Sequence, residues 1–336
     1  MADNYAFIGL GAMGYAMASN IRRKMDASAT LYINDINASV CTRFKDEYSS
    51  FGRIKIVSTA REASENAKVV ISIVPGAQDV KKVYLDEKDG VISAKKDEER
   101  VLCECSTIDV KSTREVGEKL KAEGMGTYVD TPVSGGVPAA EQGTLAMLIG
   151  HPKLSTSNPI HTRIDATLSM MGSPEKFFYL NSLGAGLTAK ISNNYLSGTI
   201  LLATAEALAI GVAQGLDPKQ LYSVIRASTG QSWMCDHVMP IPNVTDIWVP
   251  SNSGYKPGFK TQMMLKDLGL GIEGGKQVGI NPSMAEAAME VWESASKDDR
   301  CIDRDGSSIY LHIGGKLPEG YEDKGKKKDD GSWEFA

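Results

Sequence analysis

Lys190 and Asn194 are the two residues whose types and spacing most suggest chemistry. They lie four positions apart in GAGLTAKISNNYLSGTILLATAEALAIG, residues 184–211, which predicts a helix of about six to seven turns. Residues at this spacing project from one face of a helix. The segment is rich in Leu, Ile and Ala, which predicts a buried helix, and a buried lysine amine is costly without a partner or a function. Lys190 is therefore either a proton-transferring catalytic lysine or a surface lysine beside a capping asparagine.

A glycine-rich turn near the N-terminus suggests dinucleotide binding. The turn GLGAMG follows a predicted strand and opens a predicted helix, which is the context that the G-x-G-x-x-G motif requires. A second predicted strand ends at Asp35, about 20 residues on, where an acidic residue binds the adenosine ribose in dinucleotide-binding folds. A glycine triplet alone would predict only a turn, but this series predicts phosphate binding at the helix N-terminus. The expected cofactor contacts are Gly9, Leu10, Gly11, Ala12, Met13, Gly14, Asn34 and Asp35.

Asp35 also predicts which dinucleotide binds. Its carboxylate would accept hydrogen bonds from the ribose hydroxyls and would repel a 2′-phosphate. The next residues are Ile36, Asn37 and Ala38, so no arginine follows at once to neutralise a phosphate. The sequence therefore predicts NAD rather than NADP as the cofactor.

The elements that must position these residues alternate between strand and helix. The run at 69–74 is continuously apolar, which is typical of a parallel strand buried on both faces. Further strands are expected at 54–57, 101–105 and 128–134, and strands at 145–149 and 176–179 are expected to close the sheet. This pattern predicts an α/β, doubly wound (Rossmann) sheet. Ligands bind at the C-terminal ends of its strands, where Val74, Thr107 and the run Ser134-Gly135-Gly136 fall.

After Gly184 the pattern becomes helical, and no convincing strand follows. Asp217 and Pro218 are an N-cap and a first-turn proline, and helices are expected at 262–276 and 283–297. We therefore expect a Rossmann domain at 1–182 and an all-helical substrate and dimerisation domain at 183–316, joined by a long helix. Residues 317–336 are polar and are expected to be flexible or loosely docked.

Composition argues against several classes of protein. The net charge of −5 disfavours a nucleic-acid partner, and no apolar run approaches the roughly 18 residues of a membrane span, which disfavours a membrane partner. The 5 cysteines are odd in number and widely spread, which fits reduced thiols, and the 4 histidines lack metal-ligand spacing, so no metal site is expected. Residues 1–10 contain no leader pattern, so the expected compartment is the cytoplasm, or the mitochondrial matrix after removal of a leader.

Four segments together resemble the β-hydroxyacid dehydrogenase family. They are FIGLGAMG at 7–14, DTPVSGGVPAAEQGTL at 130–145, GAGLTAKISNN at 184–194 and FKTQMMLKDLGL at 259–270. The resemblance covers residues 5–314. It implies a Rossmann domain followed by a helical domain, an NAD-dependent reaction and a homodimer or homotetramer.

The resemblance also implies roles for individual residues. Lys190 would be the catalytic acid/base, and Asn194 would bind the substrate hydroxyl or carboxylate. Ser134, Gly135 and Gly136 would bind the substrate carboxylate. The implied contacts on the cofactor side are Val74, Pro75, Asp79, Thr107 and, from the helical domain, Lys266. Asp79 departs from the family, which has asparagine at this position.

Three further stretches narrow the implied activity: CSTID at 105–109, STGQSWMCDHVMPIPNV at 228–244 and DRDGSSIYL at 303–311. They imply oxidation of 3-hydroxyisobutyrate, or a close β-hydroxy acid, to its semialdehyde during valine catabolism. The alternatives are tartronate semialdehyde, 3-hydroxypropionate or serine as substrate, or a non-catalytic nucleotide-binding protein.

The residues support this chemistry independently. Oxidation of a primary alcohol needs a base, and a buried Lys190 near Lys266 would be less basic than in water. Ser134 beside two glycines offers a hydroxyl and open N–H groups to a carboxylate. Lys266 and Asp267 could instead be only a surface pair. Trp233, Met263 and Met264 are expected in the core rather than in a pocket.

Overall fold

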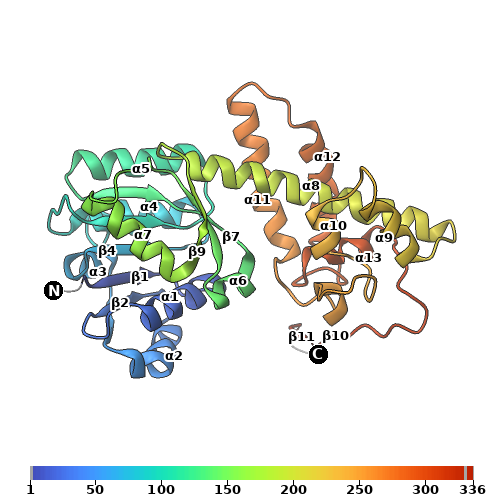
Figure 1. Ribbon diagram of the computed structural model, residues 1–336, viewed down its shortest axis with the longest axis horizontal. Helices are drawn as coiled ribbons and strands as arrows, with labels where there is room; N and C mark the ends of the chain where they lie inside the picture. The colour runs from blue at the N-terminus through green and yellow to red at the C-terminus, as the bar shows by residue number, and fades with distance from the viewer. Residues whose placement is uncertain (1–2, 329–330, 336) are drawn as a thin grey trace. The chain divides into compact units, whose positions relative to one another are not determined.

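The computed structural model describes residues 3–328 and 331–335, and the chain divides into two units, Met1–Lys190 and Ile191–Ala336. The first unit contains a parallel sheet that, among the described residues, has six strands in the order β3-β2-β1-β4-β5-β6. This order reverses at β1 and confirms the doubly wound Rossmann fold; Figure 1 labels its central strands β2, β1 and β4. The strands are β1 Tyr5–Ile8, β2 Leu31–Asn34, β3 Ile54–Ile56, β4 Val69–Ser72, β5 Val101–Glu104 and β6 Thr127–Asp130.

Helices cover both faces of this sheet because successive strand residues point to opposite sides. Phe7 packs in one apolar cluster with residues of α1 and α7, whereas Ala6 and Ile8 pack in another with residues of α3, α4 and α5. The helices of this unit are α1 Ala12–Lys24, α2 Ala38–Tyr48, α3 Ala60–Asn66, α4 Ala77–Leu85, α5 Val110–Ala122, α6 Gly136–Gln142 and α7 Pro159–Met171.

The C-terminal ends of four neighbouring strands are in register. Ile8 pairs with Ser72, Ser72 with Glu104, and Glu104 with Asp130. Ser72, Glu104 and Asp130 are fully buried polar residues in a sheet whose interior is otherwise apolar. This polar row therefore lies at the edge where an open α/β sheet binds its ligand.

The expectation that strands at 145–149 and 176–179 close the same sheet is wrong. β7 Val133–Ser134, β8 Leu145–Ile149 and β9 Gly172–Tyr179 form a separate sheet in the order β7-β8-β9. Pro132 lies two residues after the end of β6 and has no backbone N–H to continue the ladder, while its carbonyl accepts a hydrogen bond of 3.1 Å from Leu148 N. The chain therefore leaves the six-stranded sheet at this proline.

The second unit is built from helices around one apolar core that includes Leu201, Trp292 and Tyr310. Asp217 caps its second helix as expected, because the carboxylate accepts a hydrogen bond of 3.0 Å from Gln220 N. α8 extends from the first unit into this one. The helices are α8 Ala185–Ala213, α9 Pro218–Arg226, α10 Trp233–His237, α11 Thr261–Gln277, α12 Ser283–Ala295 and α13 Ile309–His312.

The C-terminal segment is docked on the second unit, contrary to the expectation of a flexible or loosely docked tail. Its described residues include a small antiparallel hairpin of β10 Gly325–Lys327 and β11 Trp333–Phe335, so strands do occur after Gly184. Arg304, which is 1% exposed, forms an ion pair of 2.5 Å with Asp323 and lies 4.2 Å from the centre of the Trp333 ring. The tail therefore supplies an acidic partner and an aromatic ring to this buried arginine.

α8 also corrects the expectation that no apolar run is as long as a membrane span. Within the described part of the chain it is the one helix long and apolar enough to cross a membrane by length and composition, with an 18-residue window of mean hydropathy 1.7. The core helix of a soluble protein passes the same test, and Leu201, Ala205 and Leu208 of α8 are buried in the core of the second unit.

Candidate active site

The glycine-rich turn has the backbone geometry that phosphate binding requires. Gly9 has a φ of +92°, and a Cβ atom there would lie 2.1 Å from the carbonyl oxygen of Ile73. A Cβ atom at Gly14 would lie 2.0 Å from the Gly9 carbonyl oxygen, so this glycine allows α1 to pack against the turn. A Cβ atom at Gly11 would meet nothing within 4 Å, which leaves the backbone open to a ligand. The three glycines therefore fit the turn, the approach and the packing that a pyrophosphate site needs.

Asp35 is held against this turn. Its Oδ2 accepts a hydrogen bond of 2.6 Å from Leu10 N, and its Oδ1 accepts one of 2.7 Å from Asn37 N. The acidic residue and the glycine turn are thus one hydrogen-bonded unit at the C-terminal ends of β1 and β2. Asn34 lies at the end of β2, and its side-chain amide donates a hydrogen bond of 2.8 Å to the Val57 carbonyl.

The turns after β4 and β5 are joined to each other. Val74 N donates a hydrogen bond of 2.7 Å to Ser106 Oγ, which places the segment of Val74 and Pro75 beside that of Thr107. Asp79 lies in the first turn of α4, where its carboxylate accepts a hydrogen bond of 3.1 Å from Gly76 N. The carboxylate of Asp79 therefore caps a helix.

Ser134, Gly135 and Gly136 form the predicted turn between β7 and α6. Gly135 has a φ of +134° and Gly136 a φ of +66°, which are conformations that side chains disfavour. A Cβ atom at Gly135 would lie 2.5 Å from the Cβ atom of Ala139. Both glycines are therefore required by the backbone, and the turn keeps Ser134 partly exposed.

Asp130, which the sequence patterns did not single out, fixes the start of α8. Its carboxylate accepts hydrogen bonds from Gly184 N at 2.8 Å and from Leu187 N at 2.9 Å. Burial raises the pKa of this fully buried group, while the backbone hydrogen bonds from Gly184 and Leu187 favour its ionised form. Lys190 follows within the next helical turn and is half-buried.

The carboxylate of Asp130 leaves little space around it. A Cβ atom at Gly150 would lie 1.8 Å from Asp130 Oδ1, and one at Gly186 would lie 2.9 Å from Oδ2. Gly184 has a φ of +85°. Three glycines from two segments therefore surround one carboxylate at the end of β6.

Within the second unit, Asn194 is paired with Asp267. The Asn194 side-chain amide donates a hydrogen bond of 2.5 Å to Asp267 Oδ2, and Lys266 Nζ lies 3.8 Å from Asp267 Oδ1. Asp267 is 5% exposed, so the alternative of a surface pair with Lys266 is wrong. Asp267 of α11 thus orients Asn194. The only sign of this role in the sequence is the position of Asp267 directly after the predicted site residue Lys266.

Two of the three residues expected in the core lie on the surface. Trp233 is 63% exposed and stacks on His237 with ring centres 4.4 Å apart, and Met263 is 40% exposed. Only Met264 is buried. Trp233 begins α10 after the cap of Ser232, so it points out from a short helix that buries Cys235 instead.

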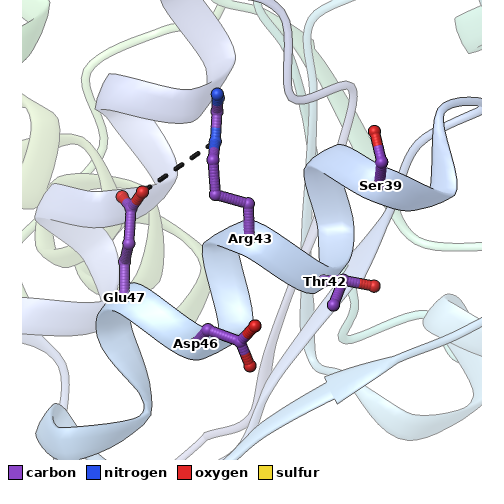
Figure 2. A pocket seen from close by; sticks show the side chains of 5 residues that line it. All are labelled: Ser39, Thr42, Arg43, Asp46 and Glu47. Atoms are coloured by element: carbon purple, nitrogen blue, oxygen red, sulfur yellow. Dashed lines mark ion pairs between the residues drawn. The ribbon is translucent and has the colours of Figure 1, made fainter.

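A hollow elsewhere in the first unit contains none of the predicted site residues. Its lining residues all lie on α2, and Figure 2 shows Arg43 and Glu47 paired on this helix. Arg43 Nε lies 3.9 Å from Glu47 Oε1. The lining residues are Ser39, Thr42, Arg43, Asp46 and Glu47. Arg43 also lies over the Tyr15 ring, whose hydroxyl donates to Glu47, so these polar groups satisfy one another. Among residues 3–328 and 331–335, no group of three or more His, Cys, Asp or Glu side chains could hold a metal ion.

Two family models match almost the whole chain. The NAD-binding domain of 6-phosphogluconate dehydrogenase matches residues 4–178, and the NAD-binding domain of NADP-dependent 3-hydroxyisobutyrate dehydrogenase matches residues 184–313. Both models end before the docked C-terminal segment.

Curated relatives and a solved structure are similar over most of their lengths. A 3-hydroxyisobutyrate dehydrogenase of Pseudomonas aeruginosa is 34% identical over 93% of this chain and 98% of its own. An NAD-dependent L-serine dehydrogenase of the same organism is 35% identical over 85% and 90% of the two chains. The mitochondrial 3-hydroxyisobutyrate dehydrogenase of Rattus norvegicus is 34% identical over 91% and 86%. The Mycobacterium tuberculosis 3-hydroxyisobutyrate dehydrogenase solved with L-serine has a TM-score of 0.80 and 28% identity, over 94% and 100%.

Proposed function

The chain belongs to the β-hydroxyacid dehydrogenase family, whose members bind NAD(P), and we propose that it oxidises 3-hydroxyisobutyrate to its semialdehyde with NAD. This reaction is a step of valine catabolism. The observation that carries the proposal is the attachment of the Lys190 helix to the sheet edge that holds the dinucleotide-binding turn. A lysine held at that edge can take a proton from a substrate bound beside the nicotinamide.

The proposed reaction removes a hydride and a proton from a primary alcohol. Bound NAD supplies the hydride acceptor. Lys190, as the neutral amine, takes the proton of the hydroxyl oxygen, so that the C–O bond becomes a carbonyl as the hydride leaves carbon. In the reverse direction the protonated amine returns this proton to the carbonyl oxygen.

The substrate would be held by groups on each side of Lys190 in the chain. Ser134 offers a hydroxyl, and Gly135 and Gly136 offer N–H groups free of side chains, to the carboxylate. Asn194 lies one helical turn after Lys190 on the same face. Its amide donates to Asp267, and its amide oxygen accepts a long hydrogen bond of 3.4 Å from the Asn193 amide. The substrate hydroxyl would replace that long bond at the oxygen, or the substrate carboxylate would accept from the second N–H of Asn194. On the cofactor side we propose contacts from the glycine turn, Asp35 and the turns after β4 and β5.

L-serine is the second candidate substrate. A relative 35% identical over 85% of this chain is named for L-serine, and the Mycobacterium tuberculosis structure was solved with it. Serine and 3-hydroxyisobutyrate share a carboxylate and a primary hydroxyl group on the β-carbon. They differ in an ammonium group where 3-hydroxyisobutyrate has a methyl group.

Steady-state kinetics on a substrate panel test the proposal. The values of kcat/KM are compared for 3-hydroxyisobutyrate, L-serine and 3-hydroxypropionate with NAD and NADP, and for reduction of tartronate semialdehyde. The proposal expects the largest value for 3-hydroxyisobutyrate with NAD. A larger kcat/KM for L-serine would make L-serine the substrate of the same reaction. If the protein turned over none of these compounds, the alternative of a non-catalytic nucleotide-binding protein would stand.

For the compartment we propose the mitochondrial matrix or the cytoplasm, since relatives include a mitochondrial enzyme and a bacterial one.

A further inference from the structure

Glu104 is a fully buried carboxyl group at the C-terminal end of β5 that the proposed reaction does not use. It lies in register between Ser72 of β4 and Asp130 of β6. A buried carboxyl group is costly to keep, because it loses its hydration and must find hydrogen-bond partners in the protein. The partners of Glu104 are therefore informative about its role.

These partners are Ser106, in the turn after β5, and Ser72, the last residue of β4. Glu104 Oε1 accepts a hydrogen bond of 2.6 Å from Ser106 N, and Oε2 is hydrogen-bonded to Ser72 Oγ. Ser106 Oγ in turn accepts the hydrogen bond of 2.7 Å from Val74 N. One carboxyl group thus fixes the turn after β5 directly and the turn after β4 through a single serine.

The glycine turn is packed on the same structure. Ile73 N donates a hydrogen bond of 3.0 Å to the Ile8 carbonyl, and a Cβ atom at Gly9 would lie only 2.1 Å from the Ile73 carbonyl oxygen. Any movement of the turn after β4 would therefore move the Ile73 carbonyl, against which Gly9 is packed. Three segments that we assign to the dinucleotide are linked through Glu104, Ser106 and Ile73.

We propose that Glu104 is a positioning residue for the dinucleotide. It does not touch the cofactor, and it holds Val74 and Ser106 in place so that the turns after β4 and β5 are formed before the dinucleotide arrives. A binding site that is already ordered avoids the entropic cost of ordering its turns on binding. This inference rests on the proposed assignment of Val74, Pro75 and Thr107 as cofactor contacts.

The carboxyl group has two states near neutral pH, and each makes a different set of hydrogen bonds. Burial, with a contribution from Asp130, raises the pKa of Glu104 to about 7, against the lowering effect of Ser106 and Ser72. The ionised group accepts from both Ser106 N and Ser72 Oγ, whereas the protonated group must donate its own proton. The other titratable groups that interact with its charge are Tyr84 of α4, Tyr128 of β6 and, on the opposite face of the sheet, Cys103 and Cys105.

Glutamine in place of Glu104 imitates the protonated state. It keeps an acceptor for Ser106 N and offers an amide N–H toward Ser72, but it cannot make the stronger bond of an ionised acceptor. The variant Glu104→Gln should therefore bind NADH as the wild type does at pH 6, and several-fold more weakly than the wild type at pH 8. A residue that only fills space in the core would not produce this dependence on pH.

Equilibrium titrations of the full chain with NADH, followed by nicotinamide fluorescence at pH 6 and pH 8, test the proposal. Ser106→Ala removes the link to Val74 without changing the strand and should raise the Kd several-fold at both pH values. Ser64→Ala is the matched control, because Ser64 is as buried but bonds only to Ala60 O within α3, and it should bind NADH normally.

The outcomes separate this proposal from the proposed function. Wild-type protein that does not bind NADH at either pH would overturn the cofactor assignment itself. Wild-type binding with the same Kd in Glu104→Gln and Ser106→Ala at both pH values would overturn only the role of Glu104. If Glu104→Gln fails to fold, Ser106→Ala tests the same chain of hydrogen bonds. This variant removes only the hydroxyl group that accepts from Val74 N.

Discussion

The carboxylate of Asp130 accepts a hydrogen bond of 2.9 Å from the backbone N–H of Leu187, three residues before Lys190. A second bond from Gly184 N makes Asp130 the cap of α8, so the first turn of this helix is attached to the end of β6. The unit that contains the dinucleotide-binding turn also contains Lys190 as its last residue. The position of Lys190 relative to the cofactor turns is therefore determined within one unit.

Replacing Lys190 by alanine should remove the proposed acid/base. We expect kcat to fall by about 10² to 10⁴, the usual contribution of positioned proton transfer, and the Kd for NAD to change little. Lys190→Arg should not restore activity, because arginine keeps its proton at working pH. Steady-state kinetics and NAD titration measure the two effects separately.

Ser134→Ala is the control for this experiment. A residue that holds the substrate carboxylate should raise KM more than it lowers kcat when its hydroxyl is removed. Near-normal turnover by Lys190→Ala would exclude this lysine from the mechanism, whatever Ser134→Ala does.

Asp35 should determine the choice of dinucleotide. Its bonds to Leu10 N and Asn37 N hold a carboxylate beside the glycine turn, while Ile36 is fully exposed. The double variant Asp35→Ala, Ile36→Arg removes the repulsion and adds a cation for a 2′-phosphate, so kcat/KM should shift toward NADP. Equal kcat/KM with NAD and NADP in the wild type would disprove the assignment.

Deleting residues 317–336 should destabilise the second unit. Arg304 would lose its ion pair with Asp323 and its contact with Trp333 while it stays buried. We expect a loss of about 1–3 kcal/mol, the cost of leaving a buried polar group without its partner, since Asp323 itself is partly exposed. Thermal unfolding measures the loss.

Two point variants refine the deletion experiment. Asp323→Ala should reproduce part of the loss, whereas Asp299→Ala removes only an exposed pair with Lys327 and should change the melting temperature little. An unchanged melting temperature after deletion would mean that the docked tail contributes nothing to folding.

The stability of the wild type should decrease as pH rises toward neutrality because of Glu104. Its folded-state pKa of about 7 lies above the ordinary pKa of 4.5 of a glutamate side chain, so the folded state binds this proton more tightly than the unfolded chain does. The stabilisation is complete below the unfolded pKa and is lost as pH rises through about 7. Urea unfolding at pH 5 and pH 8 should show Glu104→Gln gaining stability relative to the wild type at the higher pH. A constant difference between the two proteins would contradict this.

The second unit should mediate self-association into a homodimer or homotetramer. It exposes large apolar side chains that a single chain leaves in water: Leu196, Ile210, Val224 and Met284 of its helices and Ile280 between α11 and α12 are each more than half exposed. Apolar side chains of this size are costly to leave in water, so we expect another copy of the chain to cover them. Light scattering at micromolar concentration should give a mass above the 36.2 kDa of one chain. The variant Ile210→Glu should lower that mass, and a monomeric wild type would refute the proposal.

The sequence was sufficient to predict the local features of the site. The glycine turn and Asp35 were predictable because one contiguous segment carries the strand, the turn and the helix. The cap of α9 at Asp217 was predictable for the same reason, since cap and proline are adjacent. Features of this kind depend on neighbours in the chain.

Features that depend on distant segments were missed. Asp130 caps a helix that begins more than fifty residues later, and Asn194 is paired with Asp267 across a separation of 73. Trp233 was expected in the core because its side chain is large and apolar, but the short helix of α10 turns it outward. The tail was expected to be loose because its composition is polar, yet the buried Arg304 needs a polar partner.

The three glycines around the Asp130 carboxylate have a consequence for reading mutational data. In a scan of every single substitution, Gly150, Gly184 and Gly186 should tolerate as little change as Asp130, because an added methyl group would collide with the carboxylate or its surroundings or strain the backbone. Such intolerance beside Lys190 would look like the signature of a catalytic motif. The letters G-A-G before the lysine are better understood as positions where the backbone packs closely against Val110, Leu148 and the Asp130 carboxyl group.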